Sequence, residues 1–211
     1  NYLNITFTIF WILLIINSIN FIDNMDGFAS INTSFICLAL GIISFLSNQN
    51  YLADISLVLL FSISGFFILN FPPAKIYMGD SGSLFIGFVL GFISILFDWS
   101  PVNQNILYYS FTPVLLFFSI PLLDFATVLT FRIKNKISPT TGGTDHISHR
   151  LLKAGNTVKR VLGIFVIINI MIFSLLSLSI IYNQFSLFFL ILYMVLVFYL
   201  FVKFANMDVL D

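Results

Sequence analysis

Charged side chains are scarce in this sequence, and that scarcity decides the class of protein. Only 9% of the 211 residues are charged, 59% are hydrophobic, and the mean hydropathy is +1.05. A soluble domain of this length needs a charged surface to stay dispersed, so we exclude that class. The formal net charge is zero, so nothing indicates nucleic acid as a partner.

Cysteine and targeting signals are nearly absent. Cys37 is the single cysteine, so no intramolecular disulfide can form. The first apolar run leads into an acidic cluster and not into a small-residue cleavage site, so no signal peptide is indicated. The chain begins with Asn1 and enters an apolar run almost at once. We therefore expect that an N-terminal part is missing from this sequence.

Long apolar runs dominate what is present. Runs of about 18 or more residues indicate membrane-spanning helices, and these runs do not alternate as the strands of a transmembrane barrel do. We expect about seven spans, at residues 5–19, 28–46, 52–69, 83–97, 106–131, 161–182 and 185–202. The predicted fold is an all-α, polytopic transmembrane helical bundle, with residues 1–211 forming a single integral membrane domain.

Basic residues predict how this domain is oriented. Seven of the nine Lys and Arg residues lie between positions 132 and 160, and the positive-inside rule places that segment in the cytoplasm. Its Pro and paired Gly argue against a continuous helix, so we interpret 132–159 as a functional cytoplasmic loop. Counting spans backward from it places the polar segments 20–27 and 71–83 on the same face.

The first polar segment, "NFIDNMDG", places Asn20, Asp23 and Asp26 at intervals of three. Two carboxylates so close repel each other unless a cation or a donor lies between them. Asn and Asp are also ordinary turn formers, and in a soluble protein that interpretation would be the favoured one. At the end of a membrane helix, ionisable residues are costly and are usually functional, which favours a site.

The second segment, "KIYMGDSGSLFIG", sets Asp80 between glycines just before an apolar run. The start of a helix presents free N–H groups to an anion, and a carboxylate beside them suggests a phosphate bridged by a metal. An ordinary helix N-cap is the alternative. Tyr77 could offer its ring to a flat base, or it could be an interfacial aromatic residue.

The third segment, "GGTDHISHRLL", holds both histidines of the chain, with Asp145 and Arg150. No Cys or further His lies near, so zinc is disfavoured. Binding of an anion by His and Arg fits better, although a basic loop that touches anionic lipid is an open alternative. Because carboxylates and substrate phosphates together hold Mg²⁺, the three segments predict metal-dependent chemistry on a phosphorylated substrate.

These segments resemble motifs of the polyprenyl-phosphate N-acetylhexosamine-1-phosphate transferases, glycosyltransferase family 4, which includes the phospho-MurNAc-pentapeptide translocase. "NFIDNMDGFA" is similar to the family's Asn-x-x-Asp-x-x-Asp-Gly motif, and "KIYMGDSGSLFIG" to its Met-Gly-Asp-x-Gly-Ser motif. "PLLDFATV" (121–128) resembles a Pro-x-x-Asp segment, and "GGTDHISHRLL" the histidine-rich loop. The resemblance covers roughly residues 5 to 160.

The resemblance implies that a polyprenyl phosphate attacks a UDP-N-acetylhexosamine and releases UMP, with Mg²⁺ or Mn²⁺ as cofactor. This would occur at the cytoplasmic face of a bacterial inner membrane and initiate a cell-envelope polysaccharide such as lipopolysaccharide or teichoic acid; a homodimer is one expected assembly. The implied catalytic residues are Asp23, Asp26, His146, His149 and Arg150; the substrate-binding residues are Asn20, Asn24, Met25, Tyr77, Ser81, Gly82, Asp124 and Asp145; and the metal ligands are Asp80 and Asn20.

Two departures from the family pattern matter. Ser148 stands where the family has the central His of its His-x-His-His pattern, and no paired aspartates occur anywhere in the sequence. The family also has ten or eleven spans, so we expect this chain to lack about four N-terminal helices and to be incomplete as an enzyme on its own. The alternatives are an ion-coupled membrane transporter, with the aspartates binding cations, and a non-catalytic fragment.

Overall fold

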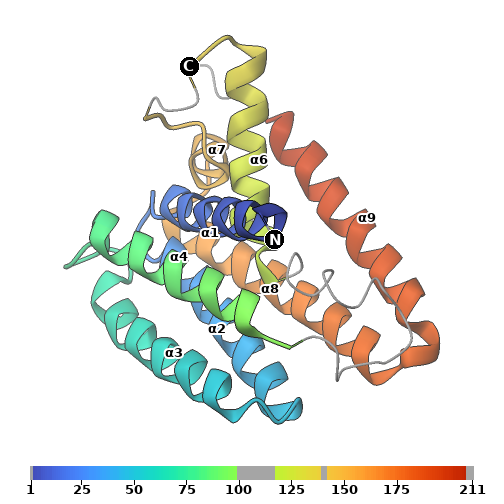
Figure 1. Ribbon diagram of the computed structural model, residues 1–211. Coiled ribbons are helices and arrows are strands. Elements are labelled where there is room, and N and C mark those ends of the chain that lie inside the picture. The colour runs from blue at the N-terminus through green and yellow to red at the C-terminus, as the bar shows by residue number, and fades with distance from the viewer. Residues whose placement is uncertain (1, 99–116, 139–141, 208–211) are drawn as a thin grey trace.

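The computed structural model describes residues 2–98, 117–138 and 142–207, and within these ranges the chain is helical, with no strand (Figure 1). The long helices are α1 (Tyr2–Ile22), α2 (Phe28–Leu46), α3 (Asn50–Asn70), α4 (Gly79–Leu96), α6 (Ser119–Lys134), α8 (Val158–Ile181) and α9 (Ser186–Ala205). Two short elements complete them, α7 (Ile147–Lys153) and the 3₁₀ turn η3 (Asn183–Phe185). The all-α prediction is confirmed.

Six of the helices are long and apolar enough to cross a membrane, namely α1, α2, α3, α4, α8 and α9. They match six of the seven expected spans, and several extend beyond the expected ends by about one turn. The remaining expected span, 106–131, lies partly outside the described residues, and its described portion belongs largely to α6. The protein is therefore an integral membrane protein whose apolar helices supply its surface.

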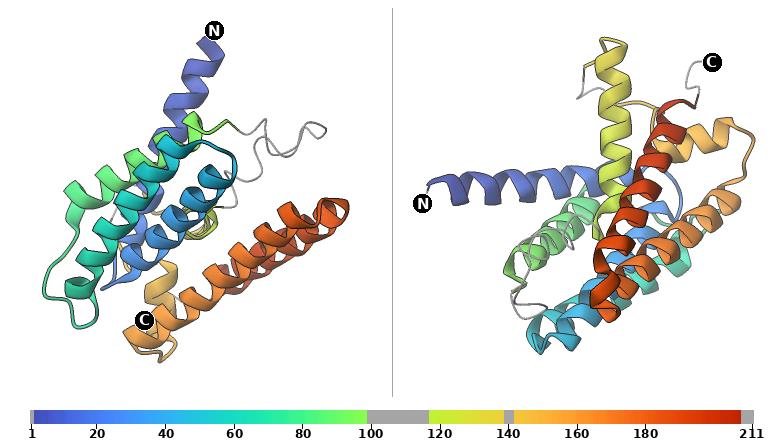
Figure 2. Two further views of the ribbon diagram at one scale, coloured as in Figure 1. Left: turned by 90° about the horizontal axis from the view of Figure 1, so that it is seen from below. Right: turned by 90° about the vertical axis from the view of Figure 1, so that its right-hand side faces the viewer.

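The helices pack in two close pairs, α1 with α4 and α2 with α3. In α4, a Cβ atom built on Gly87 would lie 2.7 Å from the Cα atom of Ile16, so only glycine allows this close approach. Small residues are a common way for membrane helices to come into contact. Figure 2 shows that α6 crosses α1 in a different direction. These contacts fix the end of α1 beside the start of α4.

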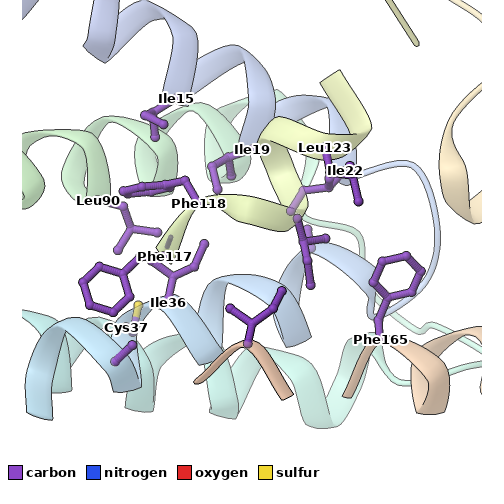
Figure 3. Packing of buried hydrophobic residues seen from close by; sticks show 14 of the residues in the cluster. Ile15, Ile19, Ile22, Ile36, Cys37, Leu90, Phe117, Phe118, Leu123 and Phe165 are labelled. Atoms are coloured by element: carbon purple, nitrogen blue, oxygen red, sulfur yellow. The ribbon is translucent and has the colours of Figure 1, made fainter. Parts of the chain in front are cut away.

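The buried apolar core lies where α1, α2, α4 and α6 meet. Ile15, Ile19 and Ile22 of α1 are fully buried, and Phe118, just before α6, lies near Ile15 and Leu90 in Figure 3. The larger cluster also includes Ile36, Cys37, Leu123 and Phe165. The core thus holds α1, the helix that leads into the polar segment 20–27, against its neighbours.

Polar side chains join helices inside the apolar region. Trp11 Nε1 donates to Ser94 Oγ at 2.9 Å, linking α1 to α4. Asn169 Nδ2 donates to Asn32 Oδ1 at 2.8 Å, linking α8 to α2. Because a polar group without a partner is costly in an apolar surrounding, these bonds fix the rotation of each helix about its axis.

Candidate active site

The turn 20–27, between α1 and α2, is the segment around which the predicted motifs gather. Gly27 has φ 73°, a left-handed conformation that glycine adopts without strain. A Cβ atom at Gly27 would lie 2.9 Å from the ring of Phe67, so close packing also requires glycine. The backbone N–H of Asp23 donates to the carbonyl of Asn20 at 3.1 Å. The turn is therefore tightly constrained at both of its ends.

Asn20 brings the first and second motifs together. Its Nδ2 donates to Asp80 Oδ1 at 3.0 Å and to Ser83 Oγ at 2.9 Å. This contact joins the last turn of α1 to the first turn of α4, which the close approach at Gly87 makes possible. The sequence prediction that these motifs share one face is met by direct contact.

Asp23 and Asp80 form a pair of neighbouring acids. The pKa of Asp23 is raised to about 6: burial is the largest cause, a hydrogen bond from the Gly79 backbone opposes it, and the charge of Asp80 adds to the rise. Such a rise is expected where two carboxylates share one site. A cation between the two side chains would reduce the repulsion between their carboxylates.

Asp26 and Asn70 attach the same turn to the segment that precedes α4. Asp26 Oδ2 accepts a hydrogen bond from the Ala74 backbone at 3.0 Å. Asn70 Oδ1 accepts from the Gly27 backbone at 2.9 Å and from Ser30 Oγ at 3.1 Å, while its Nδ2 donates to the Ile76 carbonyl at 2.9 Å. Asp26 therefore holds the loop in place in this structure.

Asp124 of α6 holds the first histidine of the loop. Its Oδ2 lies 2.7 Å from Nδ1 of His146, and its Oδ1 accepts from the Ile147 backbone at 2.7 Å. Asp124 is fully buried, and both of its oxygens are engaged within the protein. The structure thus differs from the expected substrate contact at Asp124, because no surface of the side chain is left for a ligand.

The histidine loop also contacts the turn directly. Ser148 donates a short hydrogen bond to Asn24 Oδ1. The ring of His146 meets that of Phe21 edge to face, with centroids 5.4 Å apart, and lies 6.4 Å from the ring of His149. Burial, and then the charge of His146, lower the pKa of His149. These effects favour the uncharged form of the His149 imidazole.

Asp145 and Arg132 form a buried ion pair that closes the loop onto α6. Arg132 Nε donates to Asp145 Oδ2 at 2.7 Å, and Nη2 donates to Oδ1 at 2.9 Å. Burial alone would raise the pKa of Asp145, but the hydrogen bonds and charge of Arg132 outweigh it and lower the pKa. Asp145 was expected to bind substrate, and this pairing occupies both of its oxygens instead.

Arg150 is likewise inside the protein, with 1% of its surface exposed. Its guanidinium donates to the carbonyls of Asp145, Phe204 and Met207 at 2.8, 3.1 and 3.0 Å. It also lies 5.0 Å from the centroid of the Phe131 ring. Arg150 thus ties the end of α9 to the loop, which differs from the phosphate contact expected of it.

The remaining predicted residues lie at the accessible side of this cluster. Tyr77 is 77% exposed, Ser81 is also exposed, and Met25 and Gly82 are half-buried. They flank the turn and the start of α4. Ligands could reach these residues without any rearrangement of the buried pairs.

The donor set fits a hard divalent cation at the Asp23–Asp80 pair. Asp23, Asp80 and the amide oxygen of Asn20 offer oxygen ligands, which Mg²⁺ prefers. Within the described residues no group of three or more His, Cys, Asp or Glu side chains comes together. The cation would therefore need further oxygens from substrate phosphate or water, as is usual for Mg²⁺.

Sequence reasoning missed three residues that position the site. Asn70 lies just beyond the expected span 52–69 and was given no role, Arg132 was counted only as a basic charge, and Ser148 was noted only as a departure from the family pattern. A polar amide at the end of an apolar run, just before "FPP", was the available signal for Asn70. For Arg132 nothing local distinguishes it from the exposed Lys134 and Lys136.

Comparison with known proteins defines the class to which this arrangement is related. Residues 1–98 match the family model described as glycosyl transferase family 4. The resemblance inferred from the motifs is thereby confirmed, and the matched part includes the contact between Asn20 and Asp80.

Individual relatives agree with that class. The chain is 34% identical over 149 residues to a probable undecaprenyl-phosphate N-acetylglucosaminyl 1-phosphate transferase of Bacillus subtilis (strain 168), covering 70% of this chain and 40% of the relative. It is 35% identical over 106 residues to a phospho-N-acetylmuramoyl-pentapeptide-transferase of Streptococcus thermophilus (strain CNRZ 1066), covering 49% of this chain and 31% of the relative. The chain thus spans less than half the length of these relatives.

Proposed function

We propose that this protein transfers an N-acetylhexosamine-1-phosphate from a UDP-sugar to a polyprenyl phosphate such as undecaprenyl phosphate. In the reaction an oxygen of the lipid phosphate bonds to the β-phosphorus of the UDP-sugar. The bond from that phosphorus to the bridging oxygen breaks, and UMP leaves with the electron pair. The observation that carries this proposal is the hydrogen bond from Asn20 to Asp80, which joins two motifs of a related transferase family.

Asp23, Asp80 and Asn20 are the residues that would hold Mg²⁺ or Mn²⁺. When bound, the cation would neutralise negative charge on the diphosphate as UMP departs. The raised pKa of Asp23 supports this role, since a cation would favour its ionised form. Asp26 keeps the turn in place through the Ala74 backbone, and so contributes by positioning.

Recognition of the nucleotide would fall to the exposed side of the cluster. The ring of Tyr77 is free to stack on uracil, because 77% of its surface is accessible. Met25, Ser81 and Gly82 lie on the same two segments, and the backbone N–H groups of Asp80 and Ser81, in the first turn of α4, could bind phosphate. Asn24 is held by Ser148, which connects this side to the histidine loop.

The histidines would act on the phosphates or on the sugar. Nδ1 of His146 is engaged by Asp124, so the second ring nitrogen is the atom that is available to a ligand. The lowered pKa of His149 favours the uncharged imidazole, in which one ring nitrogen donates and the other accepts a hydrogen bond. A neutral imidazole suits a positioned hydrogen bond better than an ionic contact.

Membrane placement follows from the same arrangement. The motif-bearing ends of α1, α3 and α4 share one side with the basic segment that includes α7, and the positive-inside rule assigns such a segment to the cytoplasm. We therefore propose an active site on the cytoplasmic face of a bacterial inner membrane. The product would begin a cell-envelope polysaccharide.

The test is a transfer assay on the full-length protein in membrane vesicles. Radiolabelled UDP-N-acetylglucosamine, UDP-N-acetylgalactosamine and UDP-MurNAc-pentapeptide are each supplied with undecaprenyl phosphate and Mg²⁺. We expect label in the lipid extract with one of them and an equal amount of UMP. Label in the extract without UMP would overturn the proposed reaction, and cation-driven solute uptake without lipid labelling would indicate a transporter.

A further inference from the structure

A groove lies between α2, α3 and α8, and none of the residues that line it was assigned to the proposed reaction. Its volume is about 470 Å³, and α2 packs against both of the other helices. Its lining residues are mostly apolar: Ile31, Ser34, Phe35, Ser64, Phe67, Phe71, Lys159, Leu162, Gly163 and Val166.

The groove carries a positive charge at one end. Lys159 lies in the first turn of α8, and its Nζ is 5.6 Å from the centroid of the Phe71 ring, which follows the last residue of α3. From Lys159 to Val166 the groove follows α8 for about 10 Å, at about 1.5 Å of rise per residue. The charge is therefore at the membrane boundary, and the apolar part points into the bilayer.

None of the lining residues comes from α1, α4 or α6, the helices that carry Asn20, Asp80 and Asp124. Among the parts of the chain that the structure describes, the two ion pairs found involve other residues, so the charge of Lys159 is available to a ligand. A ligand in this groove would accordingly be separate from the reacting lipid.

We propose that the groove binds a phospholipid of the surrounding membrane that carries a net negative charge. One acyl chain lies along Phe35, Phe67 and Val166, and the headgroup phosphate lies at Lys159. Charge complementarity at Lys159 selects an anionic headgroup, and the mostly apolar lining suits an acyl chain. Neither requirement depends on the proposed transfer reaction.

A lipid bound in this groove would contact two side chains that pack against the active-site turn. Phe67 and Leu162 both line the groove, and both lie within 3.1 Å of the position that a Cβ atom on Gly27 would take. An acyl chain packed on these side chains restricts their motion, and with it that of the turn that ends at Gly27. The bound lipid thus stabilises the fold next to Asp26.

Thermal unfolding of the purified full-length protein in detergent tests the proposal. Phosphatidylglycerol at ten times its dissociation constant is expected to raise the unfolding temperature by about 4 °C, and phosphatidylcholine by less than half as much. Lys159→Gln should remove the difference between the two lipids. Arg160→Gln is the matched control, because it removes the same charge from the next residue of α8, which does not line the groove.

A second pair of variants tests the apolar part. A Cβ atom would meet nothing within 4 Å at either Gly163 or Gly65, so a side chain can begin at both positions without a clash. Gly163→Leu fills the groove and should reduce the number of phosphatidylglycerol molecules retained in native mass spectrometry by one. Gly65→Leu lies on α3 outside the groove and should retain the wild-type number.

Three results would overturn the proposal. Equal shifts from the two lipids would show that charge is not recognised. Equal losses in Lys159→Gln and Arg160→Gln, or in the two glycine variants, would show that attraction is general and not located in the groove. Displacement of phosphatidylglycerol by undecaprenyl phosphate at lower concentration, abolished by Lys159→Gln, would make the groove a site for the reacting lipid instead.

Discussion

Asp124 Oδ2 lies 2.7 Å from Nδ1 of His146, and the carboxylate has no exposed surface. This pairing fixes the orientation of the imidazole from inside the protein and leaves its other nitrogen for a ligand. An aspartate that holds a histidine in this way acts through the histidine, as in other sites where a buried carboxylate orients an imidazole.

Asp124→Asn is expected to reduce kcat/KM at least tenfold, because the amide offers one acceptor where the carboxylate offers two. Either His146 or the Ile147 backbone then loses its partner. The reduction is measured in the transfer assay, with Asp54→Asn as control, since Asp54 is exposed on α3. Equal activity of the two variants would mean that the orientation of His146 is irrelevant to the reaction.

Asp80→Asn is expected to abolish transfer and to weaken binding of Mg²⁺. The asparagine keeps the hydrogen bond from Asn20 but loses the charge that a divalent cation needs. Titration calorimetry with Mg²⁺ measures the binding, and an assay at increasing Mg²⁺ measures the activity. Activity close to that of the wild type at saturating Mg²⁺ would remove Asp80 from the metal site.

Without divalent cation, stability should fall as pH rises from about 4 to about 6. The pKa of Asp23 is raised to about 6 in the folded state, so the folded protein binds more protons than the unfolded chain in this window. Asp23→Asn should therefore unfold at a higher temperature than the wild type at pH 7 and at a similar temperature at pH 4. A constant difference across this range would contradict the raised pKa.

Gly87→Ala is expected to destabilise the protein by about 1–3 kcal/mol, the usual effect of overpacking. The added methyl group would lie 2.7 Å from the Cα atom of Ile16, so α4 must move away from α1 and Asp80 away from Asn20. Activity should fall together with stability. Gly65→Ala, at an open position on α3, controls for the change in helix propensity: it should raise stability by about 0.5–1 kcal/mol and leave activity unchanged.

His149→Ala should lose transfer activity while the unfolding temperature stays within about 2 °C of the wild-type value, because its half-buried ring contributes little packing. Unfolding is followed by intrinsic fluorescence, and activity by lipid labelling. Normal turnover by His149→Ala would favour the alternative given by the sequence, in which the histidine loop is a basic surface that contacts anionic lipid.

The sequence predicted the spans and the face on which polar segments meet, since both depend on composition and order along the chain. Runs of apolar residues mark α2 and α3 to within a few residues. Charge bias and the counting of spans predicted that 20–27, 71–83 and the basic loop lie on one side. The hydrogen bond from Asn20 to Asp80 was within reach of this reasoning, because both residues were assigned to one site.

The sequence could not predict the buried contacts of Arg150 and Asp145. Arg150 looks like a phosphate ligand when it is considered beside His149, and only the arrival of α9 shows that its guanidinium is enclosed. Asp145 is taken up by Arg132 across thirteen residues of chain. Such pairings depend on how distant helices pack, and residue type and spacing do not specify that.

Asn70 restricts the sequence at a position that contacts none of the proposed ligands. Its oxygen serves two donors, and its nitrogen serves the Ile76 carbonyl. Aspartate could satisfy the donors but would repel the carbonyl, and leucine could satisfy neither. The turn and the α3–α4 connection can therefore change only together. A chimaera that takes either segment from a related protein must therefore keep an asparagine at position 70, or the turn and the connection will lose the hydrogen bonds that join them.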